Sequence, residues 1–223
     1  MSAVWLHPYL HDFPDPESVD SPDVVAVGGD LSPERLLLAY QRGIFPWYSV
    51  GEPILWWSPD PRMVVFPDEL KVSKSMRVLL NQKRFVVTCN KDFSAVMQAC
   101  KTTPRVGQSG GTWINDDMIR SYTALHRAGF AHSVEVWQGD EMVGGLYGVA
   151  IGRIFYGESM FSTVTNASKF GFIVWVQKLQ ALGFQLIDCQ QETPHLTSLG
   201  GRPIPRSAFM KIVRENESIL QLL

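Results

Sequence analysis

The hexapeptide Gly157-Glu158-Ser159-Met160-Phe161-Ser162 lies at the centre of the stretch that decides the fold, which runs over residues 134–190. The eight residues 154–161 form a run that is mainly apolar or aromatic, and Glu158 is the charged position within it. Such a composition predicts a β-strand. We therefore expect a strand that holds a carboxylate, and we work outward from it in both directions.

Strand-like runs precede this centre and a helix follows it. The turn formers Gln138-Gly139-Asp140 separate two upstream strands, and the glycines at 144, 145 and 148 are expected to weaken the second one. Downstream, Asn166 offers a helix cap and Gly183 ends the apolar helix. The predicted order is three strands (residues 133–137, 141–150 and 154–161), one helix (167–182) and a fourth strand (184–189).

This order of elements is found at the centre of acyltransferases of the N-acetyltransferase superfamily, although a fold alone says little about function. The segment before it is short and rich in turn formers, and Ser32 and Pro33 predict the cap and first position of a helix that Gly43 closes. We therefore predict an α+β fold with two domains. A small N-terminal domain covers residues 1–61, and a larger domain of the N-acetyltransferase (GNAT-like) type covers residues 62–223.

Length and composition exclude several classes of protein. A chain of 223 residues with 45% hydrophobic content can bury a sizeable core. We find no apolar run approaching the ~20 residues that cross a bilayer and no signal peptide, so the cytoplasm is the expected location and no membrane partner is expected. The cysteines at 89, 100 and 189 form no CxxC pair, and the five histidines show no metal-ligand pattern. Neither a metal nor a diffusible cofactor is implied.

Charge is distributed unevenly along the chain. Residues 1–35 contain seven acids and one base, whereas residues 71–105 contain eight bases and one acid. A basic block of this kind can gather phosphates, although a solvated helix face is the simpler interpretation when no nucleic-acid substrate is otherwise indicated. A helix starting near Ser73 would align the first of these bases along one side. The candidate phosphate contacts are Lys71, Lys74, Arg77, Lys83 and Arg84.

Tryptophans gather between prolines after the first predicted helix. Trp47 is followed within eleven positions by Trp56 and Trp57, and the neighbouring prolines forbid a regular helix. Tryptophans in such a setting often fill the seam between two domains, and we expect this of Trp56 and Trp57. An exposed ring can instead stack on an unpaired base. Trp47 and the glycine-flanked Trp113 are the better candidates for that role.

Six blocks, in order, extend the pattern over nearly the whole chain: Gly28-Gly29-Asp30-Leu31, residues 40–47, Trp56-Trp57-Ser58-Pro59-Asp60-Pro61-Arg62, Gly111-Thr112-Trp113-Ile114, residues 157–162, and Leu186-Ile187-Asp188-Cys189-Gln190. Together they resemble the bacterial leucyl/phenylalanyl-tRNA–protein transferase family. His195 and Ser198-Leu199-Gly200 also fit that family. Any one block would be a weak signal, but six in the right order make a strong one.

The resemblance implies an enzyme that moves leucine or phenylalanine from its tRNA to a protein beginning with lysine or arginine, which marks the acceptor for degradation by the N-end rule pathway. The partners implied are therefore Leu-tRNA or Phe-tRNA and such acceptor proteins, and we expect a monomer. By the same resemblance, Trp47 and Trp113 hold the terminal adenosine of the tRNA. The implied apolar pocket for the transferred side chain comprises Leu146, Phe155, Trp175, Leu179 and Ile187.

The chemistry can also be argued from the residues. The acceptor amine attacks an activated ester and must lose a proton, because an α-ammonium has a pKa of about 7.7–8.0. Asp188 and Gln190 are two apart, so on a regular strand both point to one face. We hypothesise that the Gln190 carbonyl oxygen accepts a hydrogen bond from the amine and that Asp188 fixes Gln190. Glu158 would bind a cationic group of the donor or acceptor.

Other assignments remain open at this point. A Cys189 thiol could take the aminoacyl group covalently, but alternation along the strand places it away from Asp188 and Gln190, toward the core. His195 could act as a base or simply belong to a turn. Two different functions also compete: a coenzyme A-dependent N-acyltransferase, which the lack of glycine in residues 162–169 argues against, and a non-catalytic module that binds tRNA ends.

Overall fold

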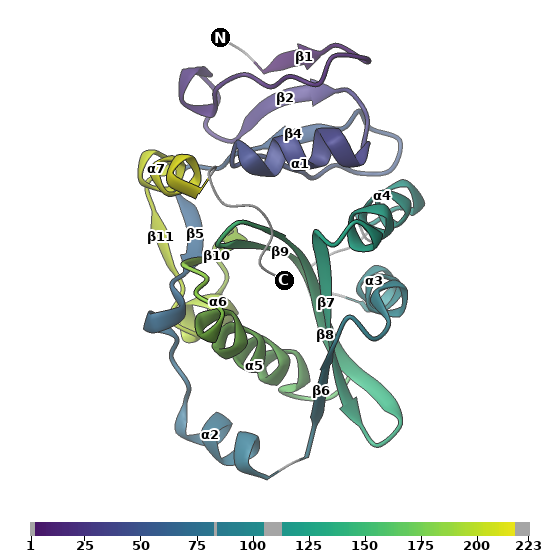
Figure 1. Cartoon of the computed structure of the whole chain (residues 1–223), viewed down its shortest axis with the longest axis vertical. Helices are drawn as coiled ribbons and strands as arrows, with labels where there is room; N and C mark the ends of the chain where they lie inside the picture. The colour runs from purple at the N-terminus through teal and green to yellow at the C-terminus, as the bar shows by residue number, and fades with distance from the viewer. Residues whose placement is uncertain (1–2, 83, 105–112, 217–223) are drawn as a thin grey trace.

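The computed structural model describes residues 3–82, 84–104 and 113–216. Two sheets organise the described chain, and Figure 1 shows the smaller one at the N-terminal end of the long axis. Its strand order is β1-β2-β4-β3. The bounds are Val4–Leu6 for β1, Val24–Gly28 for β2, Phe45–Pro46 for β3 and Leu55–Trp57 for β4, with helix α1 at Pro33–Gln41.

Helix α1 begins as the sequence predicts. The Ser32 hydroxyl caps it by accepting from the backbone N–H of Arg35, and Pro33 takes the first position, where a missing N–H costs nothing. Its buried side, which includes Leu36 and Tyr40, joins the main core. Trp56 is fully buried and donates to the carbonyl of Gly28 at 2.8 Å, so the prediction of a structural role for it is confirmed.

The larger sheet has seven strands in the order β11-β5-β10-β9-β8-β7-β6. Neighbours are antiparallel except β9 and β10, which are parallel because helix α5 connects them. The strands are β5 (Arg62–Val65), β6 (Val86–Cys89), β7 (Ala131–Gln138), β8 (Glu141–Ile151), β9 (Ile154–Ser162), β10 (Leu186–Gln190) and β11 (Arg202–Ile204). The predicted order of three strands, a helix and a strand is confirmed, and the α+β, GNAT-like fold with it.

Helices cover both faces of this sheet (Figure 1). Along β9, Ile154 and Tyr156 pack with α1 and α4 in one core cluster, whereas Phe155 packs with α5 in another, as period-two alternation requires. The helices are α2 (Lys74–Asn81), α3 (Phe93–Thr102), α4 (Asp116–Arg127), α5 (Ala167–Ala181), α6 (Pro194–Ser198) and α7 (Arg206–Asn216), and short 3₁₀ turns occupy Pro16–Ser18 and Pro67–Glu69.

One local prediction needs correction. Asn166 occupies the N-cap position of α5 but is left-handed (φ 69°), and its side chain makes no capping hydrogen bond; the Ser162 hydroxyl instead accepts from the N–H of Ser168 at 3.2 Å. The glycines of β8 do not interrupt that strand, which runs for 11 residues. A Cβ at Gly144 would lie 2.9 Å from the Cβ of Ala167, so this glycine lets the start of α5 approach the sheet.

The N-terminal sheet and the larger sheet share a core. The buried cluster that contains Val25 and Leu36 of the first also contains Tyr147 and Tyr156 of the second. Helix α7 returns to the same seam, where Arg206 donates to the carbonyl of Ser58 at 2.9 Å. The boundary between residues 61 and 62 stays a prediction. No helix among the described residues is long and apolar enough to cross a membrane.

Candidate active site

A cavity of about 430 Å³ opens where β9 and β10 separate. The two strands pair as far as Asp188 and Tyr156, and beyond that point they diverge, so the next residues of each strand face a gap. Strands β8, β9 and β10 and helices α5 and α6 all contribute to the wall. Its lining residues are Leu146, Tyr147, Phe155, Gly157, Glu158, Ser159, Met160, Ser168, Phe172, Cys189, Gln190, Thr193, His195 and Leu196.

Glu158 lies in this cavity wall and is 8% exposed. Its Oε1 accepts from Gln190 Nε2 at 3.0 Å, and its Oε2 accepts from the Tyr122 hydroxyl at 3.1 Å. The Tyr122 hydroxyl in turn forms a short hydrogen bond with that of Tyr40 on α1. Burial raises the pKa of Glu158 to about 7, against the opposing effect of the tyrosine hydrogen bonds. This carboxyl group therefore changes charge near neutral pH.

Asp188 lies behind the cavity in a fully buried ion pair. Its two carboxylate oxygens accept from Arg62 Nε at 2.8 Å and Arg62 Nη2 at 2.6 Å, which is the bidentate geometry that a guanidinium favours. The guanidinium lies over the rings of Phe45 and Phe209, with its carbon 4.8 and 4.6 Å from their centroids. Asp188 Oδ1 also accepts from the backbone N–H of Gln190 at 2.9 Å, so this pair fixes the end of β10.

A β-bulge changes the predicted geometry of β10. Asp188 pairs with Val64 and Gln190 with Met63, so Cys189 is an extra residue, and Gln190 adopts a left-handed conformation (φ 65°). The simple alternation expected of a regular strand is therefore wrong. Cys189 lines the same cavity as Gln190 instead of facing away from it, while Asp188 is buried beside Arg62. Burial raises the pKa of the Cys189 thiol well above its usual range, which makes it a poor nucleophile.

The predicted apolar pocket is only partly the observed cavity. Leu146 and Phe155 line it, and Trp175 packs edge-on behind Phe155 with ring centroids 5.4 Å apart. Leu179 and Ile187, both fully buried, lie with Trp175 in the core cluster beneath and are not among the lining residues. The sequence analysis missed Phe172 and Leu196, which do line the cavity, because their spacing is that of ordinary core positions.

Arg62, Tyr40 and Tyr122 were also missed as site residues. The sequence did contain a signal for Arg62, because this charged residue stands at the start of an apolar run. Glu158 was recognised from the same kind of signal, a charged residue within an apolar run. The two tyrosines gave none: each lies on the apolar face of a helix, where an aromatic ring is expected. Their hydroxyl groups become polar partners only when α1 and α4 meet over β9.

The two candidate stacking residues are half-buried. Trp47 packs against Trp57, with ring centroids 5.2 Å apart, and both Trp47 and Trp113 lie against the core cluster of the α4 face. The segments that hold them are joined, because Asn115 Nδ2 donates to the hydroxyl of Tyr48 at 2.9 Å. The two rings therefore come from neighbouring segments at the domain seam.

The candidate phosphate contacts lie around α2. Ser73 caps this helix by accepting from the N–H of Met76, so the predicted helix start is confirmed. In Figure 1, α2 lies at the end of the molecule opposite the N-terminal sheet. Lys83, and Gly111 and Thr112 of the quoted block around Trp113, lie outside the described residues. The other four predicted contacts, Lys71, Lys74, Arg77 and Arg84, are exposed.

His195 lies on α6 in the cavity wall, and burial lowers its pKa. Thr193, not His195, caps that helix, through the N–H of Leu196. The imidazole Nε2 is buried and has no hydrogen-bond partner among the described residues. The lowered pKa favours the neutral imidazole, so His195 contributes an uncharged ring to the cavity wall.

With this geometry established, the sequence can be compared with known families. Residues 64–214 match the family described as leucyl/phenylalanyl-tRNA protein transferase, and residues 29–60 match the description of its N-terminal domain. The chain belongs to the leucyl/phenylalanyl-tRNA–protein transferase family. It is therefore an aminoacyltransferase whose substrates are an aminoacyl-tRNA and a protein, and the predicted family is confirmed. Neither competing function, the coenzyme A-dependent acyltransferase nor the non-catalytic tRNA-binding module, was correct.

Many curated relatives carry the name leucyl/phenylalanyl-tRNA–protein transferase, and two of them illustrate the similarity. One, from Nitrosospira multiformis, is 56% identical and the match covers 96% of this chain and 90% of the relative. The other, from Flavobacterium johnsoniae, is 55% identical over 91% of this chain and 95% of the relative. The solved structure of L-PGS from Bacillus licheniformis is similar with a TM-score of 0.44 at 12% identity, covering 72% of this chain and 52% of that one. A GCN5-related N-acetyltransferase from Kribbella flavida gives 0.41 at 10% identity, with 75% and 59% covered.

Proposed function

We propose that this transferase moves leucine or phenylalanine from its tRNA to the α-amine of a protein that begins with lysine or arginine, as a monomer in the cytoplasm. The product would be marked for degradation by the N-end rule pathway. In the reaction, the amine nitrogen forms a bond to the ester carbonyl carbon. The bond from that carbon to the ribose oxygen breaks, the amine loses a proton, and the ribose oxygen gains one.

Gln190 is proposed to receive the amine. Its side-chain nitrogen already donates to Glu158, so its side-chain oxygen is left to accept a hydrogen bond from the N–H of the acceptor. Asp188 acts through position, because it accepts from the Gln190 backbone N–H and is itself held by Arg62. The hydrogen bond to this oxygen orients the neutral amine, and the proton that the nitrogen gives up as it bonds to the carbonyl carbon balances the one that the leaving ribose oxygen gains.

Glu158 is proposed to bind the cationic group that approaches Gln190. A carboxylate that is 8% exposed attracts a cation more strongly than one in water, because the surrounding dielectric is lower. Its pKa of about 7 means that it is charged mainly above neutral pH. Binding of an ammonium would lower the pKa of Glu158 and so favour its carboxylate form in the complex.

The 430 Å³ cavity is proposed to hold the transferred side chain. Its apolar wall contains Leu146, Phe155, Phe172 and Leu196, which suits an uncharged, apolar side chain such as that of leucine or phenylalanine. Trp175 would act from behind by fixing the ring of Phe155. Leu179 and Ile187 would shape the floor through the same core, and together these residues would decide the preference between leucine and phenylalanine.

The tRNA is proposed to reach this cavity from the domain seam. Trp47 and Trp113 would stack on the terminal adenosine, and each base stacked on an aromatic ring typically contributes about 1–3 kcal/mol. The body of the tRNA would lie against the basic face around α2, to which Lys71, Lys74, Arg77 and Arg84 contribute, and Lys83 is a further candidate contact. Replacing Lys74 and Arg77 with alanine should make the slope of log K for tRNA binding against log salt concentration shallower by about two.

The observation that best supports the proposal is the continuous chain of contacts from Arg62 through Asp188 and Gln190 to Glu158, at the edge of an apolar cavity. The test is transfer of labelled leucine or phenylalanine from charged tRNA to a protein beginning with arginine. Transfer should disappear when the tRNA is first deacylated, and when the acceptor begins with glutamate. Transfer that is equal to both acceptors, or that persists in a Gln190→Ala variant, would contradict the assigned roles.

A further inference from the structure

A second cavity, of about 680 Å³, lies between the N-terminal domain and α4. One wall is formed by the start of α1 and by the loop that precedes β4. The other is formed by the first two turns of α4 and the residue that caps it. The lining residues are Asp30, Leu31, Ser32, Pro33, Tyr48, Val50, Gly51, Glu52, Ile54, Asn115, Asp117, Arg120, Ser121 and Ala124. We call this cavity the seam groove.

Helix α4 connects the seam groove with the reaction site. Tyr48 and Asn115 face each other across it, joined by a hydrogen bond of 2.9 Å. Tyr48 directly follows Trp47, and Asn115 is two residues after Trp113; these tryptophans are the proposed adenosine contacts. Helix α4, which forms one wall, also supplies the Tyr122 hydroxyl that donates to Glu158. The groove and Glu158 therefore lie against the same helix.

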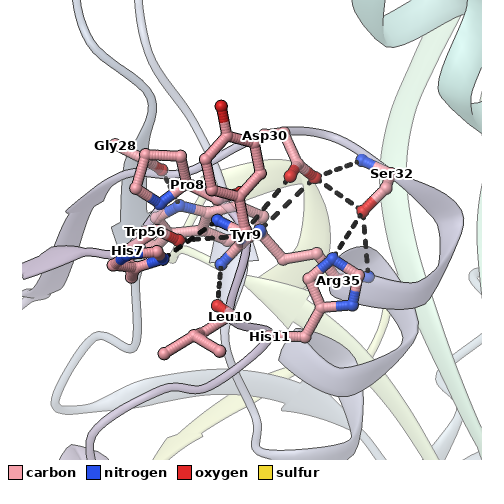
Figure 2. Close-up of polar contacts among 10 residues, drawn as sticks. All are labelled: His7, Pro8, Tyr9, Leu10, His11, Gly28, Asp30, Ser32, Arg35 and Trp56. Atoms are coloured by element: carbon pink, nitrogen blue, oxygen red, sulfur yellow. Dashed lines mark hydrogen bonds and ion pairs between the residues drawn. The ribbon is translucent and has the colours of Figure 1, made fainter.

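The N-terminal wall of the groove is rigid. Figure 2 shows Asp30 accepting from Ser32 and from Arg35, with distances of 2.6 Å from the Ser32 hydroxyl and 3.4 Å from Arg35 Nη2. Arg35 is fully buried and also donates to the backbone carbonyls of His7, Pro8 and Leu10. The corner is thus fixed before any ligand arrives, and binding there costs little ordering of the protein.

Charge separates the two ends of the molecule. Residues 1–61 contain nine acids and two bases, a net charge of −7, whereas the remaining residues have a net charge of +5. The exposed bases of α2 lie at the opposite end of the long axis from the N-terminal sheet (Figure 1). Phosphates are therefore drawn to the α2 end, and cationic groups are drawn to the N-terminal domain.

The lip of the groove combines an exposed apolar group with an exposed acid. Val50 is 73% exposed, and Glu52 is exposed beside it in the same turn. Asp30 and Asp117 add carboxylates that are paired with Arg35 and Arg120 respectively, so Glu52 is the lip carboxylate without an ion pair among the described residues. This mixture fits a polypeptide with basic and apolar side chains and disfavours an RNA strand.

We propose that the seam groove binds the acceptor polypeptide beyond its first residue, and that it favours basic side chains there. The inference rests on the proposed function, because it needs an acceptor whose first residue lies at Glu158. The groove gives the enzyme a second determinant of acceptor choice, after the identity of the N-terminal residue. It also lies apart from the basic face around α2 that is proposed to bind the body of the tRNA.

The test uses two acceptor peptides that both begin with arginine and differ only at residues three to six, which are lysines in one and glutamates in the other. Transfer from charged tRNA is measured with the wild type, with Glu52→Lys and with Asp140→Lys. Asp140 is an exposed turn residue between β7 and β8, so its variant matches the change in net charge away from the groove. KM for each peptide and for the charged tRNA is recorded.

The wild type should show a KM about fivefold lower for the lysine peptide, the range that a few exposed charge pairs produce. Glu52→Lys should reduce that ratio to about twofold or less, with KM for tRNA unchanged, and Asp140→Lys should keep the wild-type ratio. Equal KM values for both peptides in the wild type would overturn the groove proposal alone. A change in KM for tRNA in Glu52→Lys would assign the groove to RNA instead. Absence of transfer to either peptide would overturn the proposed function, and the groove proposal with it.

Discussion

Replacing Glu158 with glutamine should remove a pH-dependent loss of stability. Burial raises the pKa of Glu158 from 4.5 to about 7 in the folded protein. Between these two values the folded protein retains the proton while the unfolded chain releases it, so the free energy of unfolding falls as the pH rises through this window. Glutamine keeps the shape at this position and does not titrate, although its NH2 group donates where one carboxylate oxygen accepts.

The magnitude follows from the size of the pKa difference. A shift of this order corresponds to about 3 kcal/mol over the whole window, since each pKa unit is worth about 1.4 kcal/mol. An unfolding experiment between about pH 5.5 and about pH 8.5 would record roughly 2 kcal/mol of this change in the free energy of unfolding. His132, whose pKa burial lowers to about 4, acts in the opposite direction, because stability rises with pH while the unfolded imidazole loses its proton. The difference between wild type and variant cancels that contribution.

The measurement is urea unfolding of the wild type and Glu158→Gln at several pH values across this range. The free energy of unfolding of the wild type should fall relative to that of the variant by about 2 kcal/mol from the lowest to the highest pH. Glu141→Gln, at an exposed position at the start of β8, is the matched control and should follow the wild type. Parallel pH dependences for the wild type and Glu158→Gln would refute the raised pKa.

Four further outcomes are expected. The wild-type kcat/KM for transfer should rise through about pH 7 as Glu158 ionises. The Glu158→Gln variant should be less active, and its pH profile should show only the titration of the acceptor amine. A variant profile identical to that of the wild type would contradict this. Tyr122→Phe removes a hydrogen bond that lowers the pKa of Glu158, so the inflection of the same profile should move to higher pH, and a downward shift would be contrary evidence. Arg62→Met leaves Asp188 buried without its ion pair and should reduce the free energy of unfolding by about 3–5 kcal/mol in urea titrations, whereas a loss under about 1 kcal/mol would count against the pairing. Cys189→Ala should retain transfer while Cys189→Phe, by filling the cavity, should raise KM for the charged tRNA; inactivity of the alanine variant would instead indicate a covalent route.

Most of the order of secondary structure could be predicted because its signals are local. The Ser32-Pro33 helix start, the Gln138-Gly139-Asp140 turn and the strand around Glu158 each depend on residues within a few positions of one another. Asn166 shows the limit of this reasoning. Its residue type suits a cap, but the close approach of α5 to β8 at Gly144 places Ser162 where it takes that role instead.

The candidate site was predicted in its residues more than in its arrangement. Glu158 and Gln190 do meet, at 3.0 Å, and Asp188 does hold Gln190. The alternation assumed for the strand failed because a bulge depends on the pairing with β5, which no short segment encodes. The same bulge turns Cys189 into the cavity.

The sequence by itself determined the family, the order of strands and helices, and the identity of the polar groups available for transfer, since each of these depends on composition and short-range spacing. Only the tertiary structure decided which groups are partners. Arg62 and Asp188 are 126 positions apart, and Tyr40 and Tyr122 are 82 apart, yet each pair is fully buried and in contact. Burial also sets the pKa of Glu158, because a pKa responds to the dielectric and charges around a group and not to its neighbours in the chain.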